Sequence, residues 1–157
     1  MADRSRLAAA REAAQRRDYA ETERLAREHL ELAPDDLMGL DLLGFALYFR
    51  GAIDEAEQVC RRTLQLSPGR AYAHKGLGLC LAKRGRIEDA VACLEKAIEL
   101  RPDWFDPYWD LAVSLVEAKR YTQALEVTQR ARLSVPERVK DWDRMAKHAR
   151  TAGARAR

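Results

Sequence analysis

The sequence of 157 residues contains no asparagine, only three histidines and only three cysteines. The cysteines are odd in number and show no Cys-x-x-Cys spacing, which argues against a disulfide framework and a zinc motif. The histidines stand far apart, and none forms a His-Glu-x-x-His pair on one helical face. We therefore expect no bound metal and no other cofactor. The residues concerned are Cys60, Cys80, Cys93, His29, His74 and His148.

Long hydrophobic runs are also missing. No stretch approaches the roughly 18 uncharged apolar residues that a membrane span needs, and the N-terminal residues Met-Ala-Asp-Arg-Ser-Arg lack the apolar core of a secretion signal. The 28 basic and 25 acidic side chains leave a net charge of +3, too small to favour nucleic acid or an anionic membrane by charge alone. We expect a cytoplasmic protein. Arginine outnumbers lysine 22 to 6, which together with the missing asparagine is typical of a GC-rich bacterial genome.

Motifs for catalysis are not found. The glycine pair at Gly76 and Gly78 is followed by Leu81 instead of a third glycine, so it predicts no phosphate-binding loop. Ser114 lies within a predicted helix and has no histidine near it in sequence. Three acidic pairs fit helix caps and first-turn positions better than general acid or base roles. These pairs are Asp35-Asp36, Asp54-Glu55 and Glu88-Asp89. The sequence therefore indicates a protein that is not an enzyme.

What the sequence does contain is a repeat. Four prolines stand 34 residues apart, and each follows a segment with helical patterning: Pro34, Pro68, Pro102 and Pro136. Because proline cannot continue a helix, the spacing marks the same corner four times. Other positions recur at the same interval, and these are Leu43, Leu77 and Leu111 in one slot and Gly51, Gly85 and Lys119 in another.

This pattern, with alanines at Ala56, Ala90, Ala124 and Ala131, resembles the tetratricopeptide repeat family, whose unit is a pair of antiparallel helices. The resemblance implies an all-α fold, a right-handed α-solenoid. We expect four units at 3–34, 37–68, 71–102 and 105–136. A capping helix should follow at 137–150, and a flexible basic tail at 151–157. The apolar residues at helical spacing in this capping helix are Val139, Trp142, Met145, Ala146 and Ala149.

Local signals predict how the helices begin and end. Asp36 is a natural N-cap for a helix that runs to about Arg50, where Gly51 tolerates the positive φ of a helix end. In the fourth unit Lys119 replaces this glycine, so we expect a strained or differently closed corner. Asp106 followed by Pro107 predicts an N-cap and first helical residue, which would delay that helix and leave Trp104 and Phe105 in the corner.

Each first helix carries two stripes. In the second unit Leu40, Leu43, Gly44 and Leu47 share one face, and Asp41, Phe45 and Tyr48 lie about 120° from it. The first stripe should pack within the repeat. The resemblance implies that the second stripe faces the concave inner surface. The equivalent positions in the other units are Leu7, Arg11, Ala14, Lys75, Leu79, Ala82, Trp109, Val113 and Val116.

Uncovered apolar side chains on such a face are typical of interaction sites. We therefore predict a scaffold, adaptor or chaperone-like protein that binds a protein or peptide partner and no small-molecule substrate. The predicted contact residues are Arg11, Asp41, Phe45, Tyr48, Phe49, Lys75, Leu79, Trp109 and Val113. Arg11, Asp41 and Lys75 would orient the partner. Alternatively, Phe45, Val113 and Val116 fill gaps between helices, which leaves Tyr48, Phe49 and Trp109 at the surface.

Three other interpretations stay open. The groove or the terminal helix could join copies of the chain, so we expect a monomer or a weak homo-oligomer. Nucleic acid is an unlikely partner, because the five basic residues that favour RNA fit a solvated helix face equally well: Arg138, Lys140, Arg144, Lys147 and Arg150. One tetratricopeptide subclass grips a C-terminal carboxylate with lysines, asparagines and an arginine, but Leu7 and Arg11 occupy the first-unit slots expected for lysine and asparagine. Lys75 and Arg11 could still attract a carboxylate, but only as two scattered charges.

Overall fold

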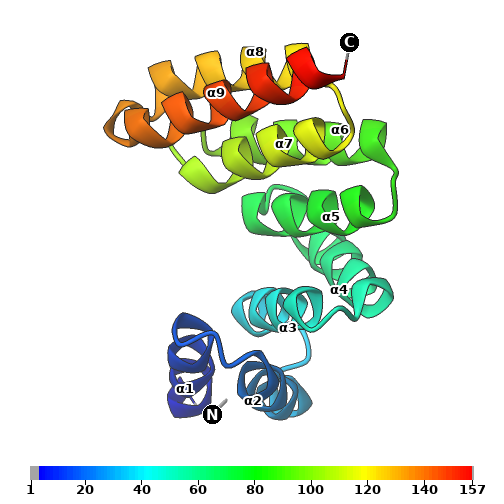
Figure 1. Ribbon diagram of the computed structural model, residues 1–157. Helices are drawn as coiled ribbons and strands as arrows, with labels where there is room; N and C mark the ends of the chain where they lie inside the picture. Colours follow the sequence, from blue (N-terminus) through cyan, green and yellow to red (C-terminus); the bar gives the residue numbers. More distant parts are fainter. Residues whose placement is uncertain (1–3, 157) are drawn as a thin grey trace.

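The computed structural model describes residues 4–156, and the side chain of Arg4 is outside that description. Within this range the chain is all-α and forms a right-handed solenoid of antiparallel helix pairs, with the N- and C-terminal helices at opposite ends (Figure 1). The helices are α1 (Arg4–Gln15), α2 (Tyr19–Leu32), α3 (Leu37–Phe49), α4 (Ile53–Leu66), α5 (Ala71–Lys83), α6 (Ile87–Leu100), α7 (Phe105–Glu117), α8 (Tyr121–Ser134) and α9 (Val139–Arg155), with a 3₁₀ turn at Pro136–Arg138.

The corner inside each helix pair has one geometry. A residue with positive φ ends each first helix, and the four such residues are Arg17 (60°), Gly51 (82°), Gly85 (74°) and Lys119 (60°). The next amide donates a hydrogen bond to the carbonyl five residues back, as in a Schellman motif. Lys119 therefore closes its corner in the same way as the glycines, although a side chain in this conformation costs free energy. Arg17 does the same in the first unit, which we did not expect.

The start of α7 differs from the sequence-based expectation. The helix begins at Phe105 with Trp104 as its N-cap residue, so it is not delayed relative to α3 and α5, and Phe105 belongs to the helix. Asp106 is not the N-cap, and Pro107 lies inside the first turn. Proline is tolerated there because the amides of the first turn have no partner within the helix. In contrast, Asp36 caps α3 as predicted and accepts a hydrogen bond from the amide of Gly39 at 2.7 Å.

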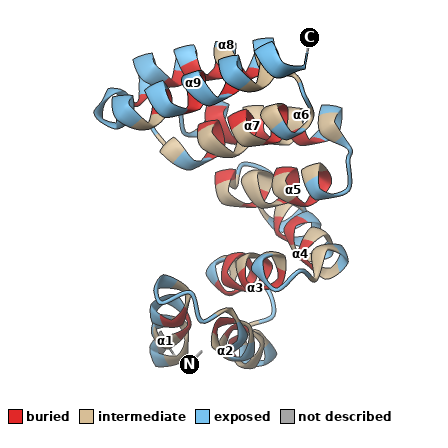
Figure 2. Ribbon diagram, viewed as in Figure 1, coloured by how far each residue is buried: buried red, intermediate tan, exposed pale blue. Residues whose placement is uncertain are grey.

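The buried residues lie on the faces between neighbouring helices (Figure 2). The stripe of α3 that was expected to pack within its repeat is buried at every position: Leu40, Leu43, Gly44 and Leu47. α3 is apolar on most of its circumference because α2, α4 and α5 all pack against it. This burial fixes the orientation of α3, and with it the direction in which the second stripe faces.

Helix α9 packs against α8 and covers the end of the last helix pair. Trp142, Met145, Ala146 and Ala149 are buried as the helical spacing indicated, whereas Val139 is exposed. The Trp142 side chain also anchors the turn before the helix, because its indole N–H donates to the Val135 carbonyl at 3.1 Å. The helix continues beyond the expected end at residue 150 to Arg155. Residues 151–155 are therefore helical instead of a flexible tail, and residue 157 lies outside the described residues.

Candidate functional site

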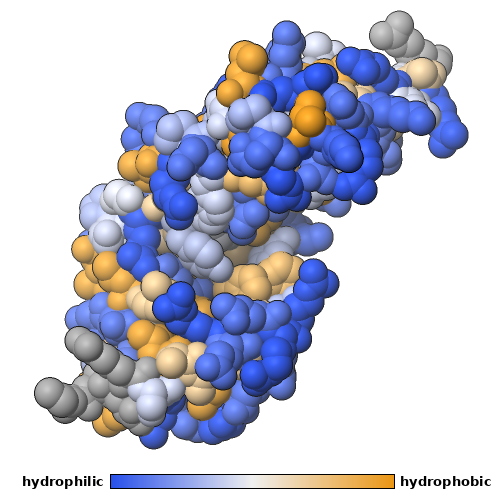
Figure 3. Space-filling model, turned by 90° about the vertical axis from the view of Figure 1, so that its left-hand side faces the viewer, coloured by the Kyte–Doolittle hydropathy of each residue, from blue (hydrophilic) through white to orange (hydrophobic). Residues whose placement is uncertain are grey.

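A hollow of about 520 Å³ opens between the first helices of the first three units. We call it the inner groove. It is lined by residues from α1, α3, the start of α5 and the end of α6, namely Arg11, Gln15, Met38, Asp41, Leu42, Gly69, Arg70, Ala71, Tyr72, Leu100 and Arg101. The space-filling view shows the molecule hollowed between its two ends, with hydrophobic residues inside the hollow (Figure 3). A pocket of this volume lies in the range that ligand sites in proteins occupy.

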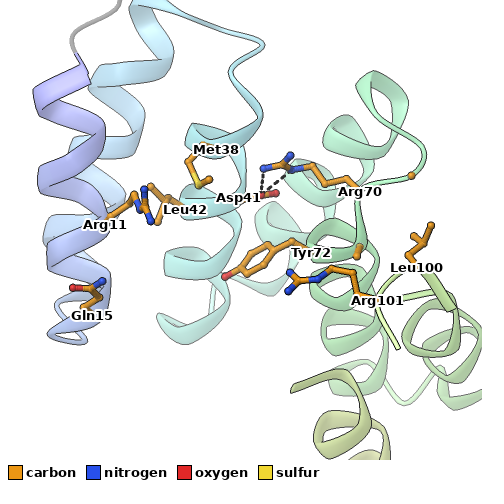
Figure 4. Close-up of a pocket in the computed structure, with 11 residues that line it drawn as sticks. Arg11, Gln15, Met38, Asp41, Leu42, Arg70, Tyr72, Leu100 and Arg101 are labelled. Carbon is orange, nitrogen blue, oxygen red and sulfur yellow. Dashed lines mark hydrogen bonds and ion pairs between the residues drawn. The ribbon is translucent and has the colours of Figure 1, made fainter. Parts of the chain in front are cut away.

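An ion pair closes one wall of the inner groove. The Asp41 carboxylate oxygen Oδ2 accepts hydrogen bonds from Nε and Nη2 of Arg70 at 2.8 and 2.6 Å (Figure 4). Asp41 is only 8% exposed. Burial raises the pKa of Asp41 above its ordinary value, although the hydrogen bonds from Arg70 act in the opposite direction. Asp41 therefore joins α3 to the start of α5, and its charge is already paired within the chain.

Lys75 is also paired within the chain. Its Nζ lies 3.4 Å from a carboxylate oxygen of Asp110 and 3.9 Å from one of Asp106, both on α7. The ammonium group also lies 5.6 and 5.5 Å from the ring centres of Tyr72 and Trp104, which stack on each other. Burial raises the pKa of Asp110 above its ordinary value, although the charge of Lys75 acts in the opposite direction. Lys75 thus links α5 to α7, where we had expected it to orient a partner.

The predicted apolar contacts Phe45, Tyr48, Phe49 and Leu79 line a narrow cleft between α3 and α5. Its volume of about 30 Å³ is comparable to that of one water molecule, so it does not accommodate a peptide side chain. Phe49 stacks on Tyr19 with a centroid distance of 4.8 Å and remains 50% exposed. Burial raises the pKa of Tyr48 to about 12. These aromatic side chains form a solid wall beside the inner groove.

Trp109 and Val113 belong to the C-terminal core. Both are half-buried and pack against the cluster around Trp142, and the Trp109 ring centre lies 6.0 Å from that of Trp142 and 5.6 Å from that of Phe105. Val116 lies against the same cluster. In the fourth unit the second stripe therefore fits the alternative interpretation, in which its side chains fill gaps between helices. Trp109 is not left uncovered at the surface.

Two of the nine predicted contact residues, Arg11 and Asp41, line the inner groove itself. The sequence analysis missed other lining residues that stand at the corners between units and not on the middle of a first helix: Met38, Arg70, Tyr72 and Arg101. A stripe counted along each helix cannot find them. The signal that could have done so is an arginine close to each of two recurring prolines: Arg70 stands two residues after Pro68, and Arg101 directly precedes Pro102.

Other classes of site find little support within residues 4–156. No group of three or more histidine, cysteine or acidic side chains could hold a metal ion in this range. Nor does any helix there have the length and apolar character to cross a membrane. His74 has a structural role, because its Nε2 lies 2.8 Å from the Pro68 carbonyl, just as the Tyr108 hydroxyl donates to the Pro102 carbonyl in the next unit.

Comparison with known proteins agrees with this architecture. The sequence model of the tetratricopeptide repeat family matches this chain twice, at residues 47–112 and at residues 81–147. A comparison with curated protein sequences found no significant match. Among solved structures, a mutant O-GlcNAc transferase of Thermobaculum terrenum is similar at 31% identity and a TM-score of 0.74 over 82% of this chain. This chain covers only 25% of that protein.

Two further structures resemble this chain along most of its length. MamA (AMB-1) has 23% identity and a TM-score of 0.71, with 92% of this chain and 85% of MamA covered. YrrB, described as a TPR protein with an unusual peptide-binding site, has 20% identity and a TM-score of 0.70, with 90% and 71% covered. At these identities the likeness shows the fold. Because the repeat model matches more than half of the sequence, the chain belongs to the tetratricopeptide repeat family.

Proposed function

We propose that this protein is a non-catalytic scaffold that binds a peptide segment of a partner protein in the inner groove. The observation that carries the proposal is the 520 Å³ hollow on the concave side, whose walls come from three successive helix pairs. Peptide binding by similarly folded proteins supports it, since YrrB is described as having a peptide-binding site. Another similar structure, at 22% identity and a TM-score of 0.67, is the TPR2B domain of yeast Sti1 in complex with pHsp70.

The groove suits a contact of modest affinity. A peptide that buried about 400 Å² of apolar surface would gain about 10 kcal/mol at about 25 cal/mol/Å². Association costs at least about 4 kcal/mol in lost freedom. The remainder corresponds to a dissociation constant on the order of tens of micromolar. Such a value fits a partner that is bound transiently or through a second contact as well.

A selection from a random peptide library displayed on phage tests the proposal. Enriched peptides are synthesised, and their affinities for the wild-type chain are measured by calorimetry. Met38 lines the inner groove and is 38% exposed, so Met38→Glu places a charge in the groove without disturbing the core. Leu133 on α8 is 82% exposed and lies outside the groove, so Leu133→Glu is the matched control.

We expect Met38→Glu to weaken binding at least about tenfold, because the peptide would lose its apolar contact with Met38 and would have to strip water from a carboxylate, which together cost more than about 1.4 kcal/mol. Leu133→Glu should leave the affinity unchanged, and thermal melts of both variants should match the wild type. A library that yields no binding peptide, or peptides that bind both variants equally well, would contradict the proposal.

A further inference from the structure

The charges that line the inner groove are unbalanced. The lining residues carry three guanidinium groups, on Arg11, Arg70 and Arg101, and one carboxylate, on Asp41. The Asp41 carboxylate forms an ion pair with Arg70. Most arginines in the described part of the chain form an ion pair with an aspartate or glutamate, but within that part Arg11 and Arg101 have no such partner. The groove therefore carries two positive charges that no carboxylate among the described residues pairs with.

Both guanidinium groups are placed to meet a ligand. Arg11 is exposed on α1 and extends toward Leu42 on α3, whereas Arg101 approaches from the opposite wall with its guanidinium group near Tyr72 (Figure 4). The Arg101 guanidinium carbon lies 4.8 Å from the ring centre of Trp104. Stacking on an aromatic ring restricts the side chain in advance, so less freedom is lost when a carboxylate binds.

From this arrangement we propose that the occupant of the inner groove is an acidic internal segment of a partner protein, with side-chain carboxylates bound by Arg11 and Arg101. The inference rests on the proposed function and specifies its ligand. Successive side chains of an extended peptide point to opposite sides, so two consecutive glutamates or aspartates reach both walls. A single C-terminal carboxylate would meet only one of them. Apolar neighbours of the acidic pair would pack on Met38 and Leu42.

The test uses a short peptide with blocked ends in which two consecutive glutamates stand between leucines, and its affinity is measured by fluorescence anisotropy. A glutamine version removes the charges, and a glutamine version with a free C-terminal carboxylate tests recognition of a chain end. The protein variants are Arg11→Gln and Arg101→Gln. Arg150→Gln is the matched control, because Arg150 is an exposed arginine of α9 without an ion-pair partner among the described residues.

We expect the glutamate peptide to bind more tightly than both glutamine peptides. Arg11→Gln and Arg101→Gln should each weaken its binding about fivefold, the upper end for an exposed ion pair, and Arg150→Gln should not change it. Binding should also weaken when the ionic strength rises from about 0.01 to about 0.15 M, because salt screens such charges.

Several results would overturn the inference. A glutamine peptide that binds as tightly as the glutamate peptide would exclude recognition of side-chain carboxylates, and tighter binding of the free C-terminal form would assign the site to chain ends. Equal losses in all three arginine variants would show nonspecific attraction. A dimer in sedimentation experiments that Arg11→Gln and Arg101→Gln dissociate, with no binding of the glutamate peptide, would assign the groove to a second copy. If library peptides bind in a way that Met38→Glu abolishes but carry no acidic residues, this inference fails while the proposed function stands.

Discussion

Replacing Trp142 by alanine tests how the C-terminal helix holds the last helix pair. The side chain is 0% exposed, and its ring contacts Phe105 and Tyr108 at centroid distances of 4.7 and 6.4 Å. Truncating a buried tryptophan costs about 3 to 5 kcal/mol through lost burial and the cavity left behind. The change also removes the donor to the Val135 carbonyl, which adds about 1 kcal/mol. We expect a total loss of about 5 kcal/mol, comparable to the whole stability of a small domain.

The loss is measured by urea denaturation followed by circular dichroism. At a slope of about 2 kcal/mol/M, the expected change lowers the midpoint by about 2.5 M. Leu133→Ala, at a side chain 82% exposed, is the control and should change stability by less than about 0.5 kcal/mol. A loss below about 1 kcal/mol for Trp142→Ala would refute the packing of α9 described above.

Three further changes test the helix contacts, the corners and the buried charge. Gly78→Ala places a methyl group 2.7 Å from Cγ of Leu94 and should cost about 1 to 3 kcal/mol in urea melts, whereas Gly69→Ala meets no atom within 4 Å and should be nearly neutral. Lys119→Gly should stabilise the chain by up to about 1 kcal/mol, because Lys119 has a φ of 60°; a lower midpoint would contradict the strained corner. Asp41 has a pKa above its ordinary 3.8, so it binds its proton more tightly when folded. The stability that Asp41 contributes is largest below pH 3.8 and is lost as the pH rises through the pKa of the folded state. The unfolding free energy of the wild type minus that of Asp41→Asn should therefore fall as the pH rises from 3.8 through that pKa. A difference that stays constant with pH would count against the raised pKa.

The fold could be predicted from the sequence because the signals that determine it are local and repeated. Proline spacing, the N-cap at Asp36 and the buried stripe through Leu43 and Leu47 depend only on neighbours within one helix pair. The predicted start of α7 was wrong because proline is compatible with more than one position in a first helical turn. In the structure the helix starts earlier, at Phe105, whose ring packs against Trp142.

The binding site could be predicted only in part, because it depends on contacts between repeat units. Nothing in the stripe of α3 reveals that Arg70, at the start of α5, pairs with Asp41. Nor does the stripe of α7 show that α9 packs beside Trp109. The helical period and the resemblance to the repeat family predict which stripe faces inward. How successive helix pairs stack decides which residues of that stripe already have partners within the chain. That stacking moves the open part of the face to the corners, where Arg101 lies.

The most direct test of the proposed groove is an amide NMR titration of the full chain with a peptide obtained from the phage selection. We predict that amide chemical shifts change at Met38, Tyr72 and Arg101, on the walls of the inner groove, and stay constant at Leu133 on α8. Changes centred on α8 and α9, with the groove residues unaffected, would contradict it.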